Sequence, residues 1–224
     1  MIKRRRTTTL TDTQCAAAWQ TASLLLGYPD EALLARRPLL RRAVAALPDG
    51  VAAPLTRFLD HLDTTPLPEL AADYVATFDH RKRCCLYLTY YAYGDTRKRG
   101  MALLRFKHAY TTAGLILDDG ELPDHLAVVL EFAAIGDADA GLRLLSEHRA
   151  GLELLRLALT DAGSPWRDVL DAVSATLPPL TGRHHDAVAR LAAEGPPEEE
   201  VGLAPFGGDP SLSVVQPDQS GARP

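Results

Sequence analysis

The sequence predicts an all-α protein, a single-domain bundle of roughly nine or ten helices. Three observations lead to this prediction. Apolar side chains recur with the helical period in nearly every segment, and no window keeps the alternation that a β-strand needs. Glycine and proline divide the chain into helix-length pieces with short connections, which favours antiparallel neighbours. With 224 residues and 46% hydrophobic content, the chain can also bury a substantial core.

The first two predicted helices have clear capping residues. The first begins near Thr11 or Asp12 and ends at Gly27. Asp30 caps the second, and Pro38 should kink or divide it because proline removes a backbone hydrogen bond. The apolar stripe of the first helix is Cys15, Trp19, Ala22 and Leu26.

Prolines mark the starts or breaks of the next two helices, which again show a helical period. Their apolar positions are Val51, Leu55, Phe58 and Leu62 in the third helix, and Leu67, Leu70, Tyr74 and Phe78 in the fourth. A compact segment at 86–93 then leads to Gly94-Asp95 and a long basic helix that ends near Ala113. One predicted side of this helix holds Met101, Leu104 and His108. The other, exposed side holds Arg99 with Arg105 or Lys107.

Four further helices are predicted in the C-terminal half. The first starts at residues 121–124, where proline and acidic side chains suit a first turn, and ends at Gly136. A long helix follows over 138–159, then one opened by Ser164-Pro165, and a last one over 184–193. The apolar positions are Leu126, Val129, Leu130 and Ala133 in the first of these, and Trp166, Val169, Leu170, Val173 and Leu177 in the third.

The two ends of the chain differ from the helical domain, which we predict at 11–194. Residues 1–10 are predicted as a flexible basic N-terminus. From Glu194 onward the composition changes to Pro, Gly, Ser and acidic residues, so 195–224 are predicted as a disordered acidic tail. Within this tail, the apolar residues 203–206 could dock in a groove of this chain or of a partner.

Charge and cysteine content point to a soluble cytoplasmic protein. Lys and Arg number 24 against 29 Asp and Glu, so the net charge of −5 gives no global attraction to nucleic acid or anionic lipid. The three cysteines are an odd number, which suits a reducing compartment. The start resembles the basic region of a signal peptide, but polar residues interrupt the apolar stretch after it. No apolar run approaches the roughly 18 residues of a membrane span, so we expect no membrane insertion.

The patterns that catalysis or metal binding requires do not occur. The cysteines form no CxxC pair, the seven histidines form no HExxH pattern, and the glycines form no phosphate-binding loop. We therefore expect no enzyme, no metal site and no cofactor of the protein's own. The adjacent Cys84 and Cys85 could be reactive thiols beside Arg83, or two small hydrophobic residues at a buried turn.

Residues 74–132 hold six of the seven tyrosines together with two runs of cations, 81–83 and 97–99. Such a surface could bind single-stranded nucleic acid by stacking and phosphate pairing. Alternatively, the tyrosines are partly buried and the charges are solvated. A surface that is aromatic and basic but lacks a catalytic pattern suggests binding rather than turnover.

Several motifs in this region resemble those of the NarJ-type assembly chaperones of respiratory nitrate reductase. They are YVATFD at 74–79, LYLTYY at 86–91, GDTRKRGM at 94–101, and ELPDHL at 121–126 followed by LEFA at 130–133. The stretch LLLGYP at 24–29 is similar to the opening motif of the family. The resemblance covers about residues 15 to 180, in the same order, and leaves both ends without a transferable motif.

The resemblance implies a system-specific cytoplasmic chaperone. It would bind the N-terminal segment of the nitrate reductase catalytic (alpha) subunit, alone or in the alpha-beta complex. It would hold this apoenzyme competent for insertion of a molybdenum cofactor and an iron-sulfur cluster before membrane attachment. We expect a monomer or weak homodimer that binds no nucleic acid. The alternative from the residues alone is a helical adaptor or single-stranded nucleic-acid-binding protein that uses the Tyr/Arg-rich segment.

The expected site for the client peptide is a groove with aromatic walls and charged rims. Its predicted residues are Tyr74, Phe78, Tyr87, Tyr90, Tyr91, Glu121, Pro123, Asp124 and His125, with a basic rim of Arg97, Lys98 and Arg99. Glu121 and Asp124 would pair with a basic peptide end, and His125 would make the affinity depend on pH. His125 could equally be an ordinary packed or capping histidine, and the basic rim could be merely solvated.

Overall fold

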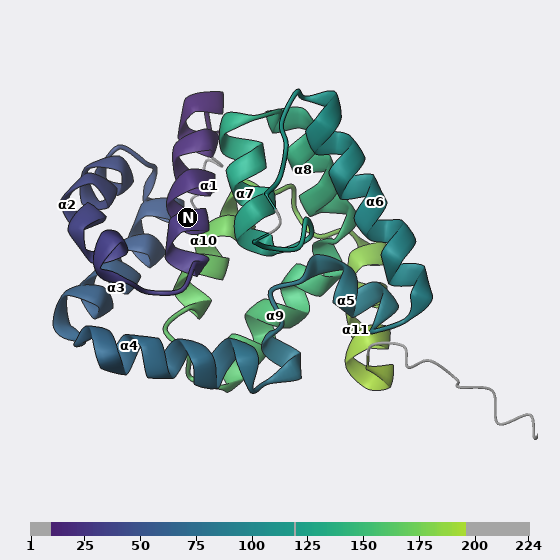
Figure 1. Cartoon of the computed structure of the whole chain (residues 1–224). Helices are drawn as coiled ribbons and strands as arrows, with labels where there is room; N and C mark the ends of the chain where they lie inside the picture. Colours follow the sequence, from purple (N-terminus) through teal and green to yellow (C-terminus); the bar gives the residue numbers. More distant parts are fainter. Residues whose placement is uncertain (1–9, 119, 196–224) are drawn as a thin grey trace, which may run out of the picture.

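The computed structural model of the chain describes residues 10–118 and 120–195, and within them it is all-helical, with no β-strand (Figure 1). The prediction of an all-α fold is confirmed. The described part contains eleven α-helices, one or two more than predicted: α1 (Asp12–Leu26), α2 (Glu31–Ala45), α3 (Asp49–Thr64), α4 (Leu67–Tyr74), α5 (Leu88–Tyr93), α6 (Arg97–Thr112), α7 (Leu126–Ile135), α8 (Ala138–Glu147), α9 (Arg149–Asp161), α10 (Arg167–Thr176) and α11 (Gly182–Glu194). The predicted N-terminus up to residue 9 and the tail from residue 196 lie outside the described residues.

The first helix has the caps that the sequence predicts. Thr11 and Gln14 form a capping box, in which the Thr11 hydroxyl accepts from the Gln14 N–H at 3.2 Å and the Gln14 side chain accepts from the Thr11 N–H at 3.0 Å. Gly27 ends α1, and the Asp30 carboxylate starts α2 by accepting from the Leu33 N–H at 2.7 Å. These caps satisfy backbone donors that no helical carbonyl reaches.

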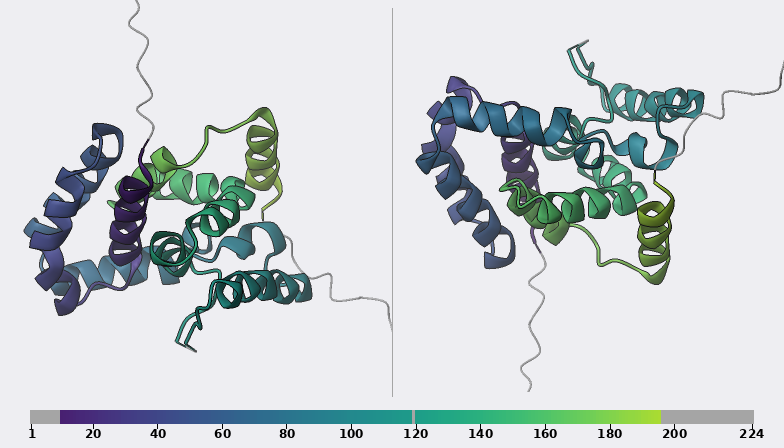
Figure 2. Two further views of the ribbon diagram at one scale, coloured as in Figure 1. Left: turned by 90° about the horizontal axis from the view of Figure 1, so that it is seen from above. Right: turned by 90° about the horizontal axis from the view of Figure 1, so that it is seen from below.

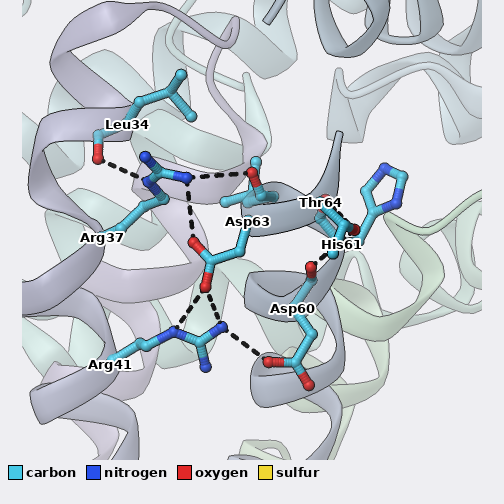
Figure 3. Close-up of polar contacts among 8 residues, drawn as sticks. Leu34, Arg37, Arg41, Asp60, His61, Asp63 and Thr64 are labelled. Atoms are coloured by element: carbon cyan, nitrogen blue, oxygen red, sulfur yellow. Dashed lines mark hydrogen bonds and ion pairs between the residues drawn. The ribbon is translucent and has the colours of Figure 1, made fainter. Parts of the chain in front are cut away.

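Of the two predicted effects of Pro38, a kink or a division, the division does not occur, because α2 runs through Pro38. A proline leaves the carbonyl four residues earlier, here that of Leu34, without its helical donor. The Arg37 guanidinium takes the place of the missing N–H, since its Nε donates to the Leu34 oxygen at 2.9 Å. The neighbouring side chain therefore repairs the helix at the proline (Figure 3).

Two arginines of α2 also fasten this helix to α3. Arg37 Nη1 lies 3.1 Å from Asp63 Oδ1, and Arg41 reaches both Asp60, at 2.7 Å, and Asp63, at 2.5 Å. Figure 3 shows Asp63 between the two guanidinium groups. These groups are partly exposed, so the network sets the register of the two helices more than it stabilises the fold.

An aromatic cluster around Trp166 forms the centre of the core. The Trp166 ring lies 5.4–5.7 Å from the rings of Phe58, Tyr74 and Phe78, which α3, α4 and the π-helical turn Val75–Asp79 contribute. Its indole N–H donates to the Leu25 carbonyl at 3.1 Å, and the Tyr74 hydroxyl donates to that of Leu26 at 3.0 Å. The predicted third-helix positions are all buried. Helix α1 packs against α7 and α10, which closes the bundle (Figure 2).

The predicted orientation of the long basic helix is wrong. Its buried side in α6 is Ala102, Phe106 and Tyr110, whereas Met101 is 69% exposed, Leu104 is 56% exposed, and His108 is also exposed. The larger aromatic rings decide the orientation, since they bury the most apolar area. Phe106 packs on His148, and Tyr110 packs on Phe132 with ring centroids 4.6 Å apart.

The later helices differ from the prediction at three boundaries. Helix α7 begins at Leu126, after the Pro-Asp-His segment rather than within it. The predicted helix 138–159 is two helices, which meet at His148. Ser164-Pro165 forms a turn ahead of α10, and the Ser164 hydroxyl finds no hydrogen-bond partner among the described residues. The last helix, α11, is observed close to its predicted position.

Helices α7 and α8 pack so closely that only a glycine fits between them. A Cβ atom on Gly141 would lie 2.4 Å from the Ala133 Cβ.

Across the described ranges, no helix combines the length and the apolar character that a membrane span needs.

Candidate functional site

Two distant segments meet in a short antiparallel bridge, which pairs Tyr87 with His125. The Leu126 N–H donates to the Leu86 carbonyl at 2.8 Å, and the Leu88 N–H donates to the Asp124 carbonyl at 3.0 Å. The bridge joins the tyrosine-rich segment to the Leu-Pro-Asp-His segment, which the sequence placed in one site without showing how they meet. We call the residues around it, Tyr87, Thr89, Arg99, Glu121, Asp124 and His125, the bridge site.

Asp124 is the buried anchor of the bridge site, with 0% of its surface exposed. Its Oδ2 accepts from the Thr89 N–H at 3.1 Å and from the Thr89 hydroxyl at 2.5 Å. This carboxylate therefore caps α5 from outside the helix, because the residue before α5, Tyr87, has no side-chain cap bond. Its other oxygen, Oδ1, is buried without a partner in the described part of the chain. The expectation that Asp124 pairs with a peptide does not suit such a position.

Arg99 connects this anchor to the surface. Its Nε donates to the Thr89 hydroxyl at 3.1 Å, and its Nη2 lies 3.8 Å from Asp124 Oδ2. Its Nη1 pairs with the exposed Asp95 at 3.0 Å, one helical turn earlier. The guanidinium also lies over the Tyr87 ring, 5.4 Å from its centroid, in a cation–π contact. Arg99 thus holds the Tyr87 ring in place rather than standing free on a rim.

Tyr87, Glu121 and His125 form the more accessible layer of the bridge site. The Tyr87 hydroxyl donates to Glu121 Oε1 at 3.0 Å, and its ring meets the His125 ring edge-on, with centroids 5.3 Å apart. Glu121 Oε2 lies 4.0 Å from His125 Nε2. Tyr87 and Glu121 are half-buried, so a ligand can reach an aromatic ring and a carboxylate together.

Burial sets the protonation states in this layer. Burial and then the hydrogen bond to Glu121 raise the pKa of Tyr87 to about 12, so the phenol stays neutral. Burial lowers the pKa of His125, against the opposing pull of Glu121 and Asp124. His125 is therefore neutral at pH 7.

The other predicted site residues lie at different depths. Tyr74 and Phe78 are buried against Trp166, and Tyr91 is buried with its hydroxyl donating to the carbonyls of Arg83, at 3.0 Å, and Cys85, at 2.9 Å. Pro123 is buried too, and its carbonyl accepts from the Tyr110 hydroxyl at 2.5 Å. The residues that reach the surface are Tyr90, half-buried, and Arg97 and Lys98, exposed.

Sequence reasoning missed Thr89 of the bridge site and Asp95, which pairs with Arg99 of that site. The spacing of Asp95 and Arg99, i and i+4 around a helix start, was a usable signal for their ion pair. Thr89 gave no such signal, since its partner Asp124 is 35 residues away.

The adjacent cysteines are not reactive thiols in this structure. Cys84 is buried, and burial raises its pKa. Burial likewise raises the pKa of Cys85 to about 11, so very little thiolate forms at neutral pH. The reading of two small hydrophobic residues at a buried turn therefore fits better than that of a thiol centre.

Comparison with known proteins places this architecture in a family. The family described as "Nitrate reductase delta subunit" matches residues 44–172, more than half of the chain, and the match includes the whole bridge site. NarJ of Bacillus subtilis (strain 168) is 30% identical over 156 residues, which cover 69% of this chain and 85% of that protein. NarJ of Escherichia coli (strain K12), a nitrate reductase molybdenum cofactor assembly chaperone, is 37% identical over 152 residues, 66% of this chain and 64% of that protein.

Two further relatives add to this. The nitrate reductase-like protein NarX of Mycobacterium tuberculosis (strain H37Rv) is 43% identical over 159 residues, but this chain spans only about a quarter of its length, 24%. A solved structure from Archaeoglobus fulgidus, proposed to be a redox enzyme maturation protein, shares the fold with a TM-score of 0.54 and 22% identity, over 72% of this chain and 91% of that one. The chain belongs to the nitrate reductase delta subunit family, which includes the NarJ-type assembly chaperones.

Proposed function

We propose that this protein is a cytoplasmic chaperone that binds the apo form of the nitrate reductase catalytic subunit through its N-terminal segment. It would keep the subunit competent for insertion of the molybdenum cofactor and an iron-sulfur cluster before membrane attachment. Family membership supports the chaperone role, because the E. coli relative is named for molybdenum cofactor assembly on nitrate reductase. The client segment and the order of insertion are our proposal.

The observation that carries the proposed binding mode is the pairing of Tyr87 with Glu121 beside His125. A short amphipathic helix can lay an apolar face on an aromatic surface while a carboxylate holds its cationic end. The Tyr87 ring is fixed from two sides, by Arg99 and by His125, so it loses little freedom when a peptide binds. The exposed side chain of Leu122 extends the apolar surface next to Glu121.

The predicted site residues then divide into two groups by burial. Tyr87, Tyr90 and Glu121 contact the peptide in this proposal, with Arg97 and Lys98 at the rim. The buried members act through the shape of the site instead: Tyr74, Phe78, Tyr91, Pro123 and Asp124. His125 is mostly buried and orients Tyr87.

Calorimetric titration tests this proposal with a peptide of the first ~15 residues of the nitrate reductase catalytic subunit from the same genome, about four helical turns. We expect saturable binding that a scrambled peptide does not show. Tyr87→Ala should weaken it by about thirtyfold, which corresponds to roughly 2 kcal/mol for an aromatic anchor. Glu121→Gln should weaken a peptide with a cationic end more than one whose cations are replaced by glutamine.

Tyr28→Ala is the matched control, because Tyr28 is an exposed tyrosine that packs on Tyr74 and is not part of the bridge site. It should bind like the unchanged protein. Equal losses in the Tyr87 and Tyr28 variants would show that the bridge site is not the peptide site. No binding to either peptide would remove the N-terminal segment as the client region, and the intact apoenzyme would then be titrated.

A further inference from the structure

The described part of the chain ends directly after helix α11. Helix α11 packs on α9, as do α5 and the 3-10 turn Lys82–Cys84, and none of its described side chains is fully buried. Figures 1 and 2 place the C-terminal end of α11 beside α5, near the start of α6. Residues 196–224 continue from this point.

Exposed cations occur on two elements of this region, Arg81, Lys82 and Arg83 on the 3-10 turn and Arg97 and Lys98 at the start of α6, and we call these five residues together the basic face. Among the described residues, no ion pair joins Arg81, Lys82, Arg83 or Lys98 to an acidic side chain. The acidic groups closest in sequence are Asp79 and Asp95, of which Asp95 pairs with Arg99.

Helix α6 adds two features that favour an acidic and apolar occupant. It starts with three cations and has no acidic residue in its first turn, where a negative charge would be stabilised by the helix dipole. Further along the same helix, Met101 and Leu104 are the exposed apolar side chains. A partner that carries carboxylates followed by apolar residues would therefore complement this end of α6 better than a purely acidic one.

The chain's own sequence contains such a segment directly after α11. Glu198, Glu199 and Glu200 are consecutive and are followed by VGLAPF at 201–206, with no cation in between. The whole stretch beyond Gly195 carries five acidic residues and one arginine, Arg223. The order of the two chemistries, carboxylates first and apolar residues second, matches the order of cations and apolar side chains along α6.

We infer that residues 198–206 dock on the basic face of the same molecule, with Glu198–Glu200 on the cations and 201–206 toward Met101 and Leu104. An extended chain spans up to about 3.5 Å per residue. Glu198 can thus reach roughly 10 Å from Gly195, and Phe206 reaches several times farther. Docked in this way, the segment covers Arg97 and Lys98, so a client that uses these cations must displace it.

Tethering favours this occupant over a second copy of the chain or an acidic client. A short flexible connection gives the segment an effective concentration in the millimolar range, far above that of any separate molecule at micromolar concentration. The individual ion pairs lie at the surface, where salt screens them. The docking should therefore be intramolecular, reversible and sensitive to ionic strength.

The test compares amide NMR spectra of the full chain with those of two full-chain variants at low salt. The variant Glu198→Gln/Glu199→Gln/Glu200→Gln removes the proposed contact charges. The control Asp209→Asn/Asp218→Asn removes acidic residues farther along the same segment. We expect the first variant to shift amides at 81–83 and 95–104, and the control to leave them in place. Roughly 0.5 M NaCl, where the Debye length falls to a few ångströms, should make the unchanged protein resemble the first variant.

Two reciprocal variants identify the cations involved. Lys98→Glu should reproduce the shifts if the contact lies on α6, and Arg81→Glu/Lys82→Glu/Arg83→Glu if it lies on the 3-10 turn. Identical spectra of the unchanged protein and the triple Gln variant over 81–104 would overturn the inference. Shifts that grow with protein concentration would overturn it as well, since they would indicate docking between two copies.

Discussion

The carboxylate of Asp124 caps helix α5 through Thr89, a residue 35 positions earlier in the chain. It accepts both hydrogen bonds that Thr89 offers at the start of the helix, and Arg99 lies against the same oxygen. A six-residue helix such as α5 is too short to be stable alone, so it depends on this distant cap. The acidic residue of the Leu-Pro-Asp-His segment is thus a structural residue of the tyrosine-rich segment.

Asp124→Ala should lower the free energy of unfolding by about 3–5 kcal/mol, because it leaves the Thr89 donors buried without their acceptor and leaves Arg99 with only its exposed partner, Asp95. Urea unfolding followed by circular dichroism measures this loss. Asp95→Ala removes the exposed partner of the same arginine and should cost about 1 kcal/mol or less. Similar losses in both variants would contradict the role of Asp124 as the anchor.

Arg37→Ala should lower the free energy of unfolding by about 1 kcal/mol, because the Leu34 carbonyl beside Pro38 loses its donor and Asp63 loses a partly exposed partner that contributes little. The exposed neighbour Arg36 is the matched control, and Arg36→Ala should change stability by less than about 0.5 kcal/mol. In the double variant Arg37→Ala/Pro38→Ala the backbone N–H returns and should recover the loss. If Arg37→Ala is neutral, the proline is tolerated in α2 for another reason.

Gly141→Ala should destabilise the protein by about 1–3 kcal/mol, since its methyl group would collide with the Ala133 backbone across the α7–α8 contact. Gly100 offers the opposite case on an exposed turn of α6, where a Cβ meets nothing within 4 Å. There, Gly100→Ala should stabilise by up to about 1 kcal/mol, from helix propensity alone. Thermal melts of the two variants should therefore shift in opposite directions; shifts of the same sign would rule out the close contact as the cause.

Stability should fall as the pH drops below 6.5, because burial lowers the pKa of both His125 and His148 in the folded chain. The unfolded chain then takes up protons first, so the contribution of these groups is complete above their ordinary pKa and is lost toward their folded pKa. Glu121 and Asp124 face His125, while Glu147 and Arg105 lie near His148.

Denaturant unfolding at pH 7.5 and pH 5.5 measures this slope, the change in the free energy of unfolding with pH. The variant His125→Asn should reduce it, whereas the exposed His108→Asn should not. Because burial lowers the pKa of His125, any change in peptide affinity that its protonation causes should occur below pH 6.5. An unchanged slope in His125→Asn would show that acid sensitivity comes from other groups.

Local signals in the sequence predicted most of the fold but only part of the candidate site. Caps such as Thr11 and Asp30 act over three or four residues, so the pattern of nearby residues is enough to locate them. The orientation of α6 could not be read in this way, because Met101 and Phe106 both fit an apolar stripe and only the partners of Phe106 and Tyr110 decide between them. The boundary at Leu126 depends on a pairing with Leu86, which periodicity does not contain.

The antiparallel bridge also fastens the two ends of the chain that contains α5 and α6. Leu88 is tied to Asp124 on one side, and Leu126 to Leu86 on the other, so everything between them is a closed loop. We therefore expect the whole loop to unfold locally in a single cooperative step. Deuterium should therefore enter the buried amides of α6 and those of the bridge at the same rate. A destabilising substitution anywhere along α6 should also increase amide exchange at Tyr87.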